Sequence, residues 1–200
     1  MQPEIITDSL TLRPLAERDV PALTHAWSDP EIRRWCMAVP LTFAPGDVRE
    51  FVAMAHILAE AETEFIWAIE EHRQLRGMVS LFDITEGNAQ VGFWLAPNAR
   101  GHGVLTRALH ALTQAAFADE DLALDRLTWT SIEGNIDSRR AAVRAGFAEI
   151  RFVPGGTAGR PDSAGRPTRL DAWQGVLTRS RWEHFAENFG ATRRRTPRAA

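Results

Sequence analysis

The sequence contains no lysine and no tyrosine, and it has a single cysteine, Cys36. Without these residues the chain has no lysine amine for a Schiff base and no phenol to act as a catalytic acid. One cysteine can form neither an internal disulfide nor a cysteine-based zinc site, which fits a reducing, cytoplasmic compartment. Cys36 lies far in sequence from the motifs described below, so we interpret it as a buried or incidental thiol.

Long apolar runs and a strong net charge are also missing. No stretch approaches the roughly 18 apolar residues of a membrane span, and residues 1–4 do not resemble the start of a secretory signal. The formal charge of −3 provides no general attraction to nucleic acid, despite the arginines at 193–195. The six histidines include no closely spaced ligand pair, so we expect no metal. The composition is typical of a soluble enzyme domain.

The spacing of apolar residues predicts a mixed α/β domain over residues 1–189. The expected strands are 5–13, 65–70, 76–84, 89–95, 127–132, 148–152 and 170–177, and the expected helices are 16–28, 30–38, 48–61, 102–118, 136–145 and 179–189. Residues 154–167 are rich in glycine and proline, which predicts a flexible loop. Residues 190–200 are expected to form a disordered basic tail.

The first informative segment is a strand, a turn and a helix within residues 89–109. The turn reads Arg100-Gly101-His102-Gly103, and two glycines allow a tight bend and the close approach of a ligand. Free amides at the helix start, together with the helix dipole, favour an anion such as a pyrophosphate. No P-loop motif is present, and Thr106 stands where a dinucleotide-binding motif would have its third glycine. Because such turns also occur without a ligand, the turn alone leaves both interpretations open.

The second informative segment spans residues 133–147. Asn135 and Ser138 lie one turn apart where a helix should begin, so they could cap that helix or contact a ligand. Arg139 and Arg140 follow, and arginine side chains bind phosphate well. The chain contains no Gly-x-Ser-x-Gly motif, which argues against an acyl-enzyme mechanism.

Taken together, these segments resemble the GNAT superfamily of acyl-CoA-dependent N-acetyltransferases, especially its RimJ/RimL-type branch of ribosomal-protein N-terminal acetyltransferases. The resemblance runs from about residue 6 to residue 183. It rests on LRPL at 12–15, VGFWLAP at 91–97, RGHG at 100–103, the N-x-x-S and GF pairs of 135–147, and LTRSRW at 177–182. It implies a GNAT-like fold, with a twisted, mostly antiparallel sheet of about seven strands flanked by helices. It also implies direct attack of an amine on acetyl-CoA as cosubstrate.

The same resemblance assigns roles to particular residues. Ser138 is the expected catalytic residue and would donate a hydrogen bond to the departing thiolate. Trp35 and Gln90 are the expected acceptor-binding residues. Gln90 stands where many members have a glutamate base, and Asn98 stands where the family turn starts with glutamine or arginine. The expected acetyl-CoA contacts are Phe93, Trp94, Leu95, Arg100, Gly101, His102, Gly103, Val104, Leu105, Thr106, Asn135 and Arg140.

The amide of Gln90 also bears on the acceptor, because it cannot accept a proton. Deprotonating an α-amine of pKa about 7.8 costs roughly 1 kcal/mol at pH 7, against roughly 4.6 kcal/mol for a lysine of pKa about 10.4. We therefore expect a protein or peptide N-terminus as acceptor, with Asp83, Glu86 or Asp171 as carboxylates that could receive the proton through water. A small-molecule amine and a catalytically weak acyl-CoA-binding regulatory domain are the alternatives. No membrane or nucleic-acid partner is expected, and a homodimer is left open.

Overall fold

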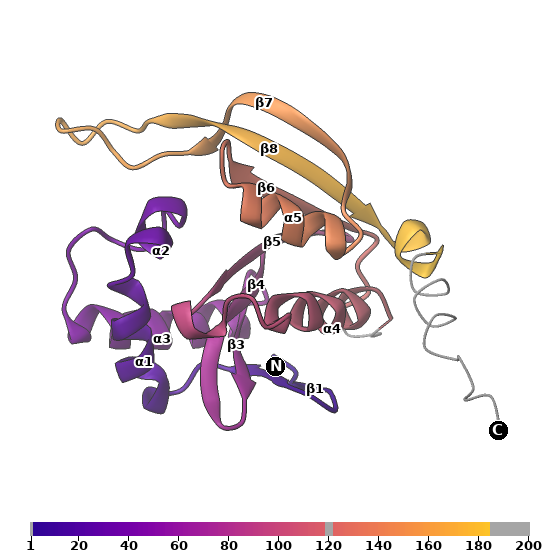
Figure 1. The fold of residues 1–200 in the computed structure, drawn as a ribbon, viewed down its shortest axis with the longest axis horizontal. Coiled ribbons are helices and arrows are strands. Elements are labelled where there is room, and N and C mark those ends of the chain that lie inside the picture. Colours follow the sequence, from indigo (N-terminus) through magenta and orange to yellow (C-terminus); the bar gives the residue numbers. More distant parts are fainter. Residues whose placement is uncertain (1, 119–121, 185–200) are drawn as a thin grey trace.

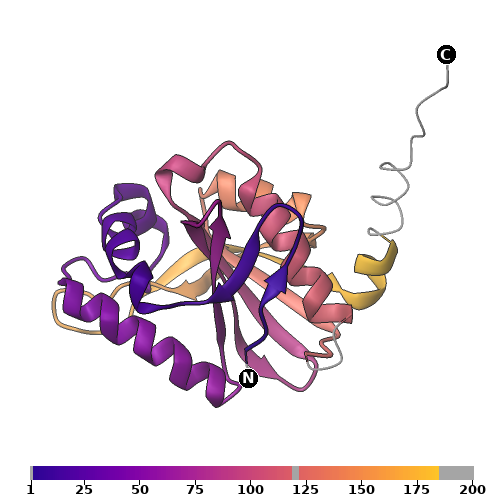
Figure 2. The ribbon, with the colours of Figure 1, turned by 90° about the horizontal axis from the view of Figure 1, so that it is seen from below.

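The computed structural model describes residues 2–118 and 122–184, which form one sheet with helices on both of its faces (Figures 1 and 2). The strands are β1 Ile5–Ile6, β2 Thr11–Pro14, β3 Phe65–Glu71, β4 Gln74–Thr85, β5 Asn88–Leu95, β6 Arg126–Ile132, β7 Ala148–Ala158 and β8 Arg169–Thr178. The α-helices are α1 Val20–Trp27, α2 Pro30–Trp35, α3 Pro45–Glu60, α4 Val104–Ala118 and α5 Ile136–Arg144, with short 3-10 helices at Glu17–Asp19 and Pro97–Ala99. None of these helices is long and apolar enough to cross a membrane.

The sheet has eight strands in the order β1-β2-β3-β4-β5-β6-β8-β7. Every neighbouring pair is antiparallel except β5 and β6, which confirms the expected mixed, mostly antiparallel architecture. The segment 5–13, expected as one strand, is instead a hairpin of β1 and β2. Its turn is closed by Thr7, whose Oγ1 donates to Leu10 O at 2.8 Å and accepts from Leu10 N at 3.1 Å. A threonine that bonds backbone groups nearby competes with a continuous strand.

Strand alternation divides the core into two layers. Ala89 and Val91 of β5 point to one face, where they pack with the buried side chains of α4 and α5. Trp94, which has the opposite parity, packs against the cluster formed with α1, α2 and α3. The central strands are therefore covered on both faces. Helices α4 and α5 pack on one face, and α1, α2 and α3 pack on the other.

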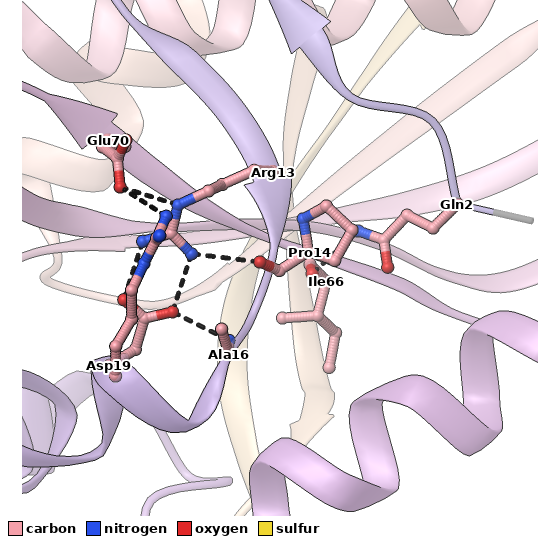
Figure 3. A network of polar contacts seen from close by, with 8 residues as sticks. Gln2, Arg13, Pro14, Ala16, Asp19, Ile66 and Glu70 are labelled. Atoms are coloured by element: carbon pink, nitrogen blue, oxygen red, sulfur yellow. Dashed lines mark hydrogen bonds and ion pairs between the residues drawn. The ribbon is translucent and has the colours of Figure 1, made fainter. Parts of the chain in front are cut away.

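A buried ion cluster joins the first helical region to the sheet (Figure 3). Arg13 of β2 donates through both terminal nitrogens to the Asp19 carboxylate, each bond being 2.7 Å long. Its Nε donates to Glu70 Oε2 of β3, also at 2.7 Å. The hydrogen bonds to Asp19 raise the pKa of Arg13 even though burial opposes its charge. Because Asp19 immediately precedes α1, this bidentate pair fixes where the α1–α3 layer starts.

The segment 154–167 differs from the expected flexible loop. Residues 154–158 continue β7, and the remainder forms a turn in which Gly159 N donates to Thr168 O at 2.9 Å and Asp162 N to Arg166 O at 3.0 Å. Pro154 and the following glycines are accommodated because the pairing register shifts between Val153 and Thr157 and β7 lies at the sheet edge. The expected helix at 179–189 is helical over 179–184, and its remainder, with the tail 190–200, lies outside the described residues.

Candidate functional site

The sheet opens between its two parallel strands. β5 pairs with β6 only from Asn88 to Val91, opposite Arg126 to Trp129. Beyond this point β5 continues along β4 to Leu95, while β6 continues along β8 to Ile132. Figure 1 shows β6, β8 and β7 turning away from β3–β5. Residues 92–95 pair with β4 on one side, but on the side that faces β6 their backbone pairs with no strand of the described residues. An extended ligand could bind there as an additional strand.

The Gly-rich turn lies at the end of this free strand edge. Gly101 and Gly103 have φ angles of 80° and 69°, a region that favours glycine. Arg107 N donates to Gly103 O at 3.2 Å, so the amides before Arg107 lie at the start of the helix, where intrahelical partners are missing. A Cβ on Gly101 would meet no atom within 4 Å, and one on Gly103 would meet only Arg107 Nη1 at 3.5 Å. The turn therefore has space beside its glycines and amides without intrahelical partners at the helix start, which suits a pyrophosphate.

The side chains of this turn point in several directions. Arg100 turns toward α2, where its Nη2 donates to Asp29 Oδ1 at 2.6 Å and to Leu95 O at 3.3 Å. Burial acts to raise the pKa of Asp29, but the hydrogen bonds from Arg100 and the Ile32 amide outweigh it, so the pKa is lowered. The role of Arg100 as a phosphate ligand thus stays a prediction, and the structure adds a link between the turn and α2.

The remaining turn residues differ in what they can offer a ligand. His102 lines a cavity of about 200 Å³ together with Glu71, His72, Arg76, Asn98, Ala99 and Val104. Val104 is buried in the core, so only its backbone amide is available, whereas Leu105 and Thr106 are partly exposed. These contacts to the cosubstrate remain predictions based on the position of the helix start.

The start of α5 lies beside the opened strands. Asn135 caps this helix, because its Oδ1 accepts a hydrogen bond from Ser138 N at 3.2 Å. Ser138 Oγ accepts a hydrogen bond from the indole Nε1 of the buried Trp129 at 3.1 Å. With its oxygen accepting, the Ser138 hydroxyl keeps its own proton for donation to a further group. The prediction that Asn135 caps the helix is confirmed, whereas its contact with pantetheine stays a prediction.

Two arginines in the first half of α5, Arg139 and Arg140, are exposed. Arg140 forms an exposed ion pair with Asp137, with Nη1 and Oδ1 3.4 Å apart. The guanidinium of Arg139 lies over the ring of Trp173, 4.9 Å from its centroid. Exposed pairs of this kind contribute little to stability, so Arg140 can exchange Asp137 for a phosphate.

Trp35 reaches the same region from the opposite side. A Cβ on Gly134 would lie 3.7 Å from Trp35 Cη2, which places the indole against the turn that precedes Asn135. The Trp35 Nε1 donates to Glu31 Oε2 at 2.9 Å, and the Arg34 guanidinium stacks on the ring at 4.5 Å from its centroid. The structure thus brings Trp35 close to the N-terminal end of α5, although the two are far apart in the sequence.

Gln90 contacts a carboxylate group. Its Nε2 donates to Asp83 Oδ2 at 2.6 Å, and Asp83 has a φ of 50° where the β4–β5 register is irregular. Asp83 also interacts with Glu64, whose pKa is raised by burial and by the charge of Asp83. Sequence reasoning missed Glu64, because a charged residue before an apolar strand carries no signal and only the pairing of β3 with β4 brings it near Asp83.

The other candidate carboxylates lie elsewhere. Asp171 accepts from Gly155 N at 2.8 Å within the β7–β8 hairpin, and Glu86 lies in the turn between β4 and β5. Cys36 follows α2, and burial raises the pKa of its thiol. In the described parts of the chain, no group of three or more His, Cys, Asp or Glu side chains is arranged to hold a metal ion.

Comparison with known proteins agrees with this geometry. Residues 9–148 match the family described as an acetyltransferase (GNAT) domain. That match covers more than half of the sequence, and the chain therefore belongs to the GNAT family of acetyltransferases.

Two curated relatives carry N-acetyltransferase names. YdaF of Bacillus subtilis (strain 168), whose name places it among ribosomal N-acetyltransferases, is 38% identical over 77 residues, which are 38% of this chain and 41% of YdaF. The match thus spans less than half of that relative. Protein p20 of Bacillus licheniformis, an uncharacterized N-acetyltransferase, is 27% identical over 122 residues, or 59% of this chain and 68% of p20.

Solved structures share the fold. RimL, a ribosomal L7/L12 α-N-protein acetyltransferase solved with coenzyme A, superposes with a TM-score of 0.72 at 18% identity, covering 88% of this chain and 98% of RimL. MccE, a microcin C7 self-immunity acetyltransferase solved with acetyl-CoA and AMP, has a TM-score of 0.69 at 21% identity, covering 86% and 93%. One fold thus serves proteins whose names refer to different substrates.

Proposed function

We propose that this protein transfers the acetyl group of acetyl-CoA to the N-terminal α-amine of a protein or peptide, by direct attack in a ternary complex. The observation that carries the transfer chemistry is the opening between β5 and β6, with a free strand edge, an amide-lined turn and Ser138 around it. The observation that favours an α-amine is Gln90, an amide that contacts Asp83 where a base would otherwise stand.

The cosubstrate fits the groups that line this opening. Backbone amides of the Gly101–Gly103 turn and of the first turn of α4 would bind the pyrophosphate. The free edge of Phe93, Trp94 and Leu95 would pair with the pantetheine amides in the manner of an added strand. The Asn135 Oδ1 is engaged in its cap, so the amide nitrogen of its side chain is the group left to hold pantetheine.

Ser138 and the β5 backbone act on the charges that develop during transfer. The amine nitrogen forms a bond to the thioester carbonyl carbon, and the carbon–sulfur bond then breaks. A backbone amide of residues 93–95 would stabilise the thioester oxygen as it becomes negative. Ser138 would donate its proton in a hydrogen bond to the thiolate, while Trp129 donates to Ser138 Oγ. Because a thiol of pKa about 8.5 is far more acidic than a serine hydroxyl, Ser138 stabilises the thiolate without giving up its proton.

The amine must also lose a proton, and Gln90 cannot accept it. Gln90 donates from Nε2 to the Asp83 carboxylate at 2.6 Å, and the charge of Asp83 also acts on Glu64. We infer that water carries the proton from the amine to this carboxylate pair. At pH 7 roughly 14% of an α-amine of pKa near 7.8 is already neutral, against about 0.04% of a lysine of pKa near 10.4. An indirect route to a carboxylate therefore suits the α-amine better.

The test is a single peptide that carries both an N-terminal amine and a lysine, with one or the other blocked. We expect the free N-terminus to be acetylated faster near neutral pH, with a rate that rises through the titration of that amine. In a Gln90→Glu variant, the acetylation rate should increase most for the peptide whose only free amine is the lysine, because a carboxylate then lies beside the acceptor. Faster acetylation of the lysine by the unmodified protein would overturn the α-amine assignment.

Two alternatives are decided by the same assay. A small-molecule acceptor predicts turnover with small amines and none with either peptide. An acyl-CoA-binding regulatory domain predicts binding of acetyl-CoA without release of free thiol in the presence of any of these amines. Thiol release that depends on the added amine excludes the regulatory domain.

A further inference from the structure

Helix α2 is held by three segments that lie far from it in the sequence. At its start, the N-cap residue Asp29 forms the ion pair with Arg100 of the Gly-rich turn. At its end, Trp35 packs against Gly134, next to the start of α5. The third contact comes from Arg160, at the far end of the β7–β8 hairpin, which reaches out beside α2 (Figure 1).

Arg160 binds a cluster of backbone carbonyls where α2 ends. Its Nη2 donates to Arg33 O at 2.6 Å and to Cys36 O at 3.2 Å. Its Nη1 donates to Val39 O at 2.7 Å and to Met37 O at 3.3 Å. The last carbonyls of a helix lack intrahelical partners and carry partial negative charge, so a cation that bonds them fixes both the helix end and the chain that follows.

The hairpin holds Arg160 itself firmly in place. Gly159 N donates to Thr168 O at 2.9 Å, and Thr168 Oγ1 donates to Arg160 O at 2.5 Å. A Cβ on Gly159 would lie 2.3 Å from Thr168 Oγ1, so only glycine allows this close approach of the two arms. The Arg160 backbone is therefore fixed on both sides, and its planar guanidinium is directed at α2.

We propose that Arg160 is a positioning residue for the amine acceptor. By fixing the end of α2, it keeps Trp35 against Gly134 and so shapes the acceptor side of the opening between β5 and β6. The hydrogen bonds of Arg160 reach the end of α2, whereas the Gly-rich turn is linked to the start of α2 through Asp29 and Arg100. We therefore expect binding of acetyl-CoA to change little when Arg160 is substituted. This proposal rests on the proposed function and on Trp35 as an acceptor-binding residue, and it adds a determinant of acceptor affinity that lies outside the reacting groups.

The test compares Arg160→Lys with the control Arg166→Lys. Lysine keeps the charge but cannot span carbonyls as the planar guanidinium does. Arg166 lies in the same hairpin and pairs with Asp162 of that hairpin. We expect Arg160→Lys to raise the KM for a peptide with a free N-terminus at least tenfold, to leave the KM for acetyl-CoA within twofold, and to speed amide hydrogen exchange at residues 33–39. The control should change none of these.

The outcomes separate this proposal from the assignment of the acceptor. Equal changes in both KM values would indicate general loss of structure and overturn the positioning role. Unchanged peptide KM together with faster exchange would show that α2 is anchored without influence on the acceptor, which also overturns it. If the unmodified protein acetylates no peptide, the proposed acceptor is wrong. The KM comparison of Arg160→Lys with Arg166→Lys is then made with a small amine that the protein does acetylate, and an unchanged KM for that amine overturns the positioning role. Absence of turnover with every amine overturns it as well.

Discussion

The two sides of the opening between β5 and β6 are built in different ways. The proposed cofactor side is one short stretch, the turn Arg100–Gly103 and the start of α4, and it would work through backbone amides and glycine φ angles. The proposed acceptor side combines Trp35, Gln90 and Arg160 from separate parts of the chain, and it would work through side chains. A cosubstrate shared by a family can be bound by local backbone geometry, whereas a particular acceptor requires side chains that only folding brings together.

The largest effect on binding of acetyl-CoA should come from breaking the cofactor side alone. In Gly103→Val, a branched side chain is forced into a φ of 69° beside the free amides, so we expect acetyl-CoA to bind at least tenfold more weakly. That factor corresponds to about 1.4 kcal/mol of binding free energy. Isothermal titration calorimetry measures it directly.

The matched control for this variant is Gly165→Val. Gly165 has a φ of 74° and open space around its Cβ direction, but it lies in the turn of the β7–β8 hairpin. This control should carry similar backbone strain and bind acetyl-CoA as the unmodified protein does. Unchanged affinity in a folded Gly103→Val variant would place the pyrophosphate elsewhere.

An effect on turnover, and not on binding of acetyl-CoA, is expected at Ser138, where the two sides meet. Ser138→Ala keeps the Asn135 cap, because that bond uses the backbone N–H, and removes only the hydroxyl. A hydrogen bond to a charged group contributes about 1.5–3 kcal/mol, so kcat should fall at least about tenfold. The KM for acetyl-CoA should stay within twofold, because the bond strengthens only as the sulfur gains charge.

Steady-state kinetics with Ser163→Ala as control tests this expectation, since Ser163 lies in the hairpin turn. If the kcat of Ser138→Ala stays within twofold of that of the unmodified protein, Ser138 has no catalytic role. Water would then stabilise the thiolate.

The smallest effect concerns the link between the two sides, Asp29 with Arg100. Asn serves as well as Asp at a helix N-cap, so Asp29→Asn removes the ion pair and keeps the cap. We expect a loss of less than about 1 kcal/mol in the free energy of unfolding at pH 7, because Arg100 is partly exposed.

The pH dependence of that loss follows from the lowered pKa of Asp29 in the folded state. Its contribution to stability is present above the unfolded pKa of about 3.9 and is lost as the pH falls through the lower folded pKa. Urea unfolding at pH 7 and at acid pH should therefore show a deficit that shrinks with acidification. An equal deficit at both pH values would contradict the ion pair as its source.

Local patterns predicted the central elements well. The alternation of 89–95, the glycines of the turn and the helical spacing after it predicted β5 and α4 because each depends on residues close together in the chain. The N-terminal strand was predicted wrongly, because Thr7 bonds Leu10 and turns the chain. The extension of β7 was missed because Pro and Gly suppress a strand prediction, although an edge strand tolerates both.

The sequence by itself determined the fold class, the family and the positions of the Gly-rich turn and of the Asn135–Ser138 helix start, since these depend on spacing and backbone preference within short segments. Only the tertiary structure decided that β5 and β6 separate after Val91, that Glu64 lies near Asp83, and that Arg160 binds the end of α2. Those contacts join residues whose separation along the chain contains no information about their distance in space. They form because packing the two layers of helices against one twisted sheet brings these strands, turns and helix ends together.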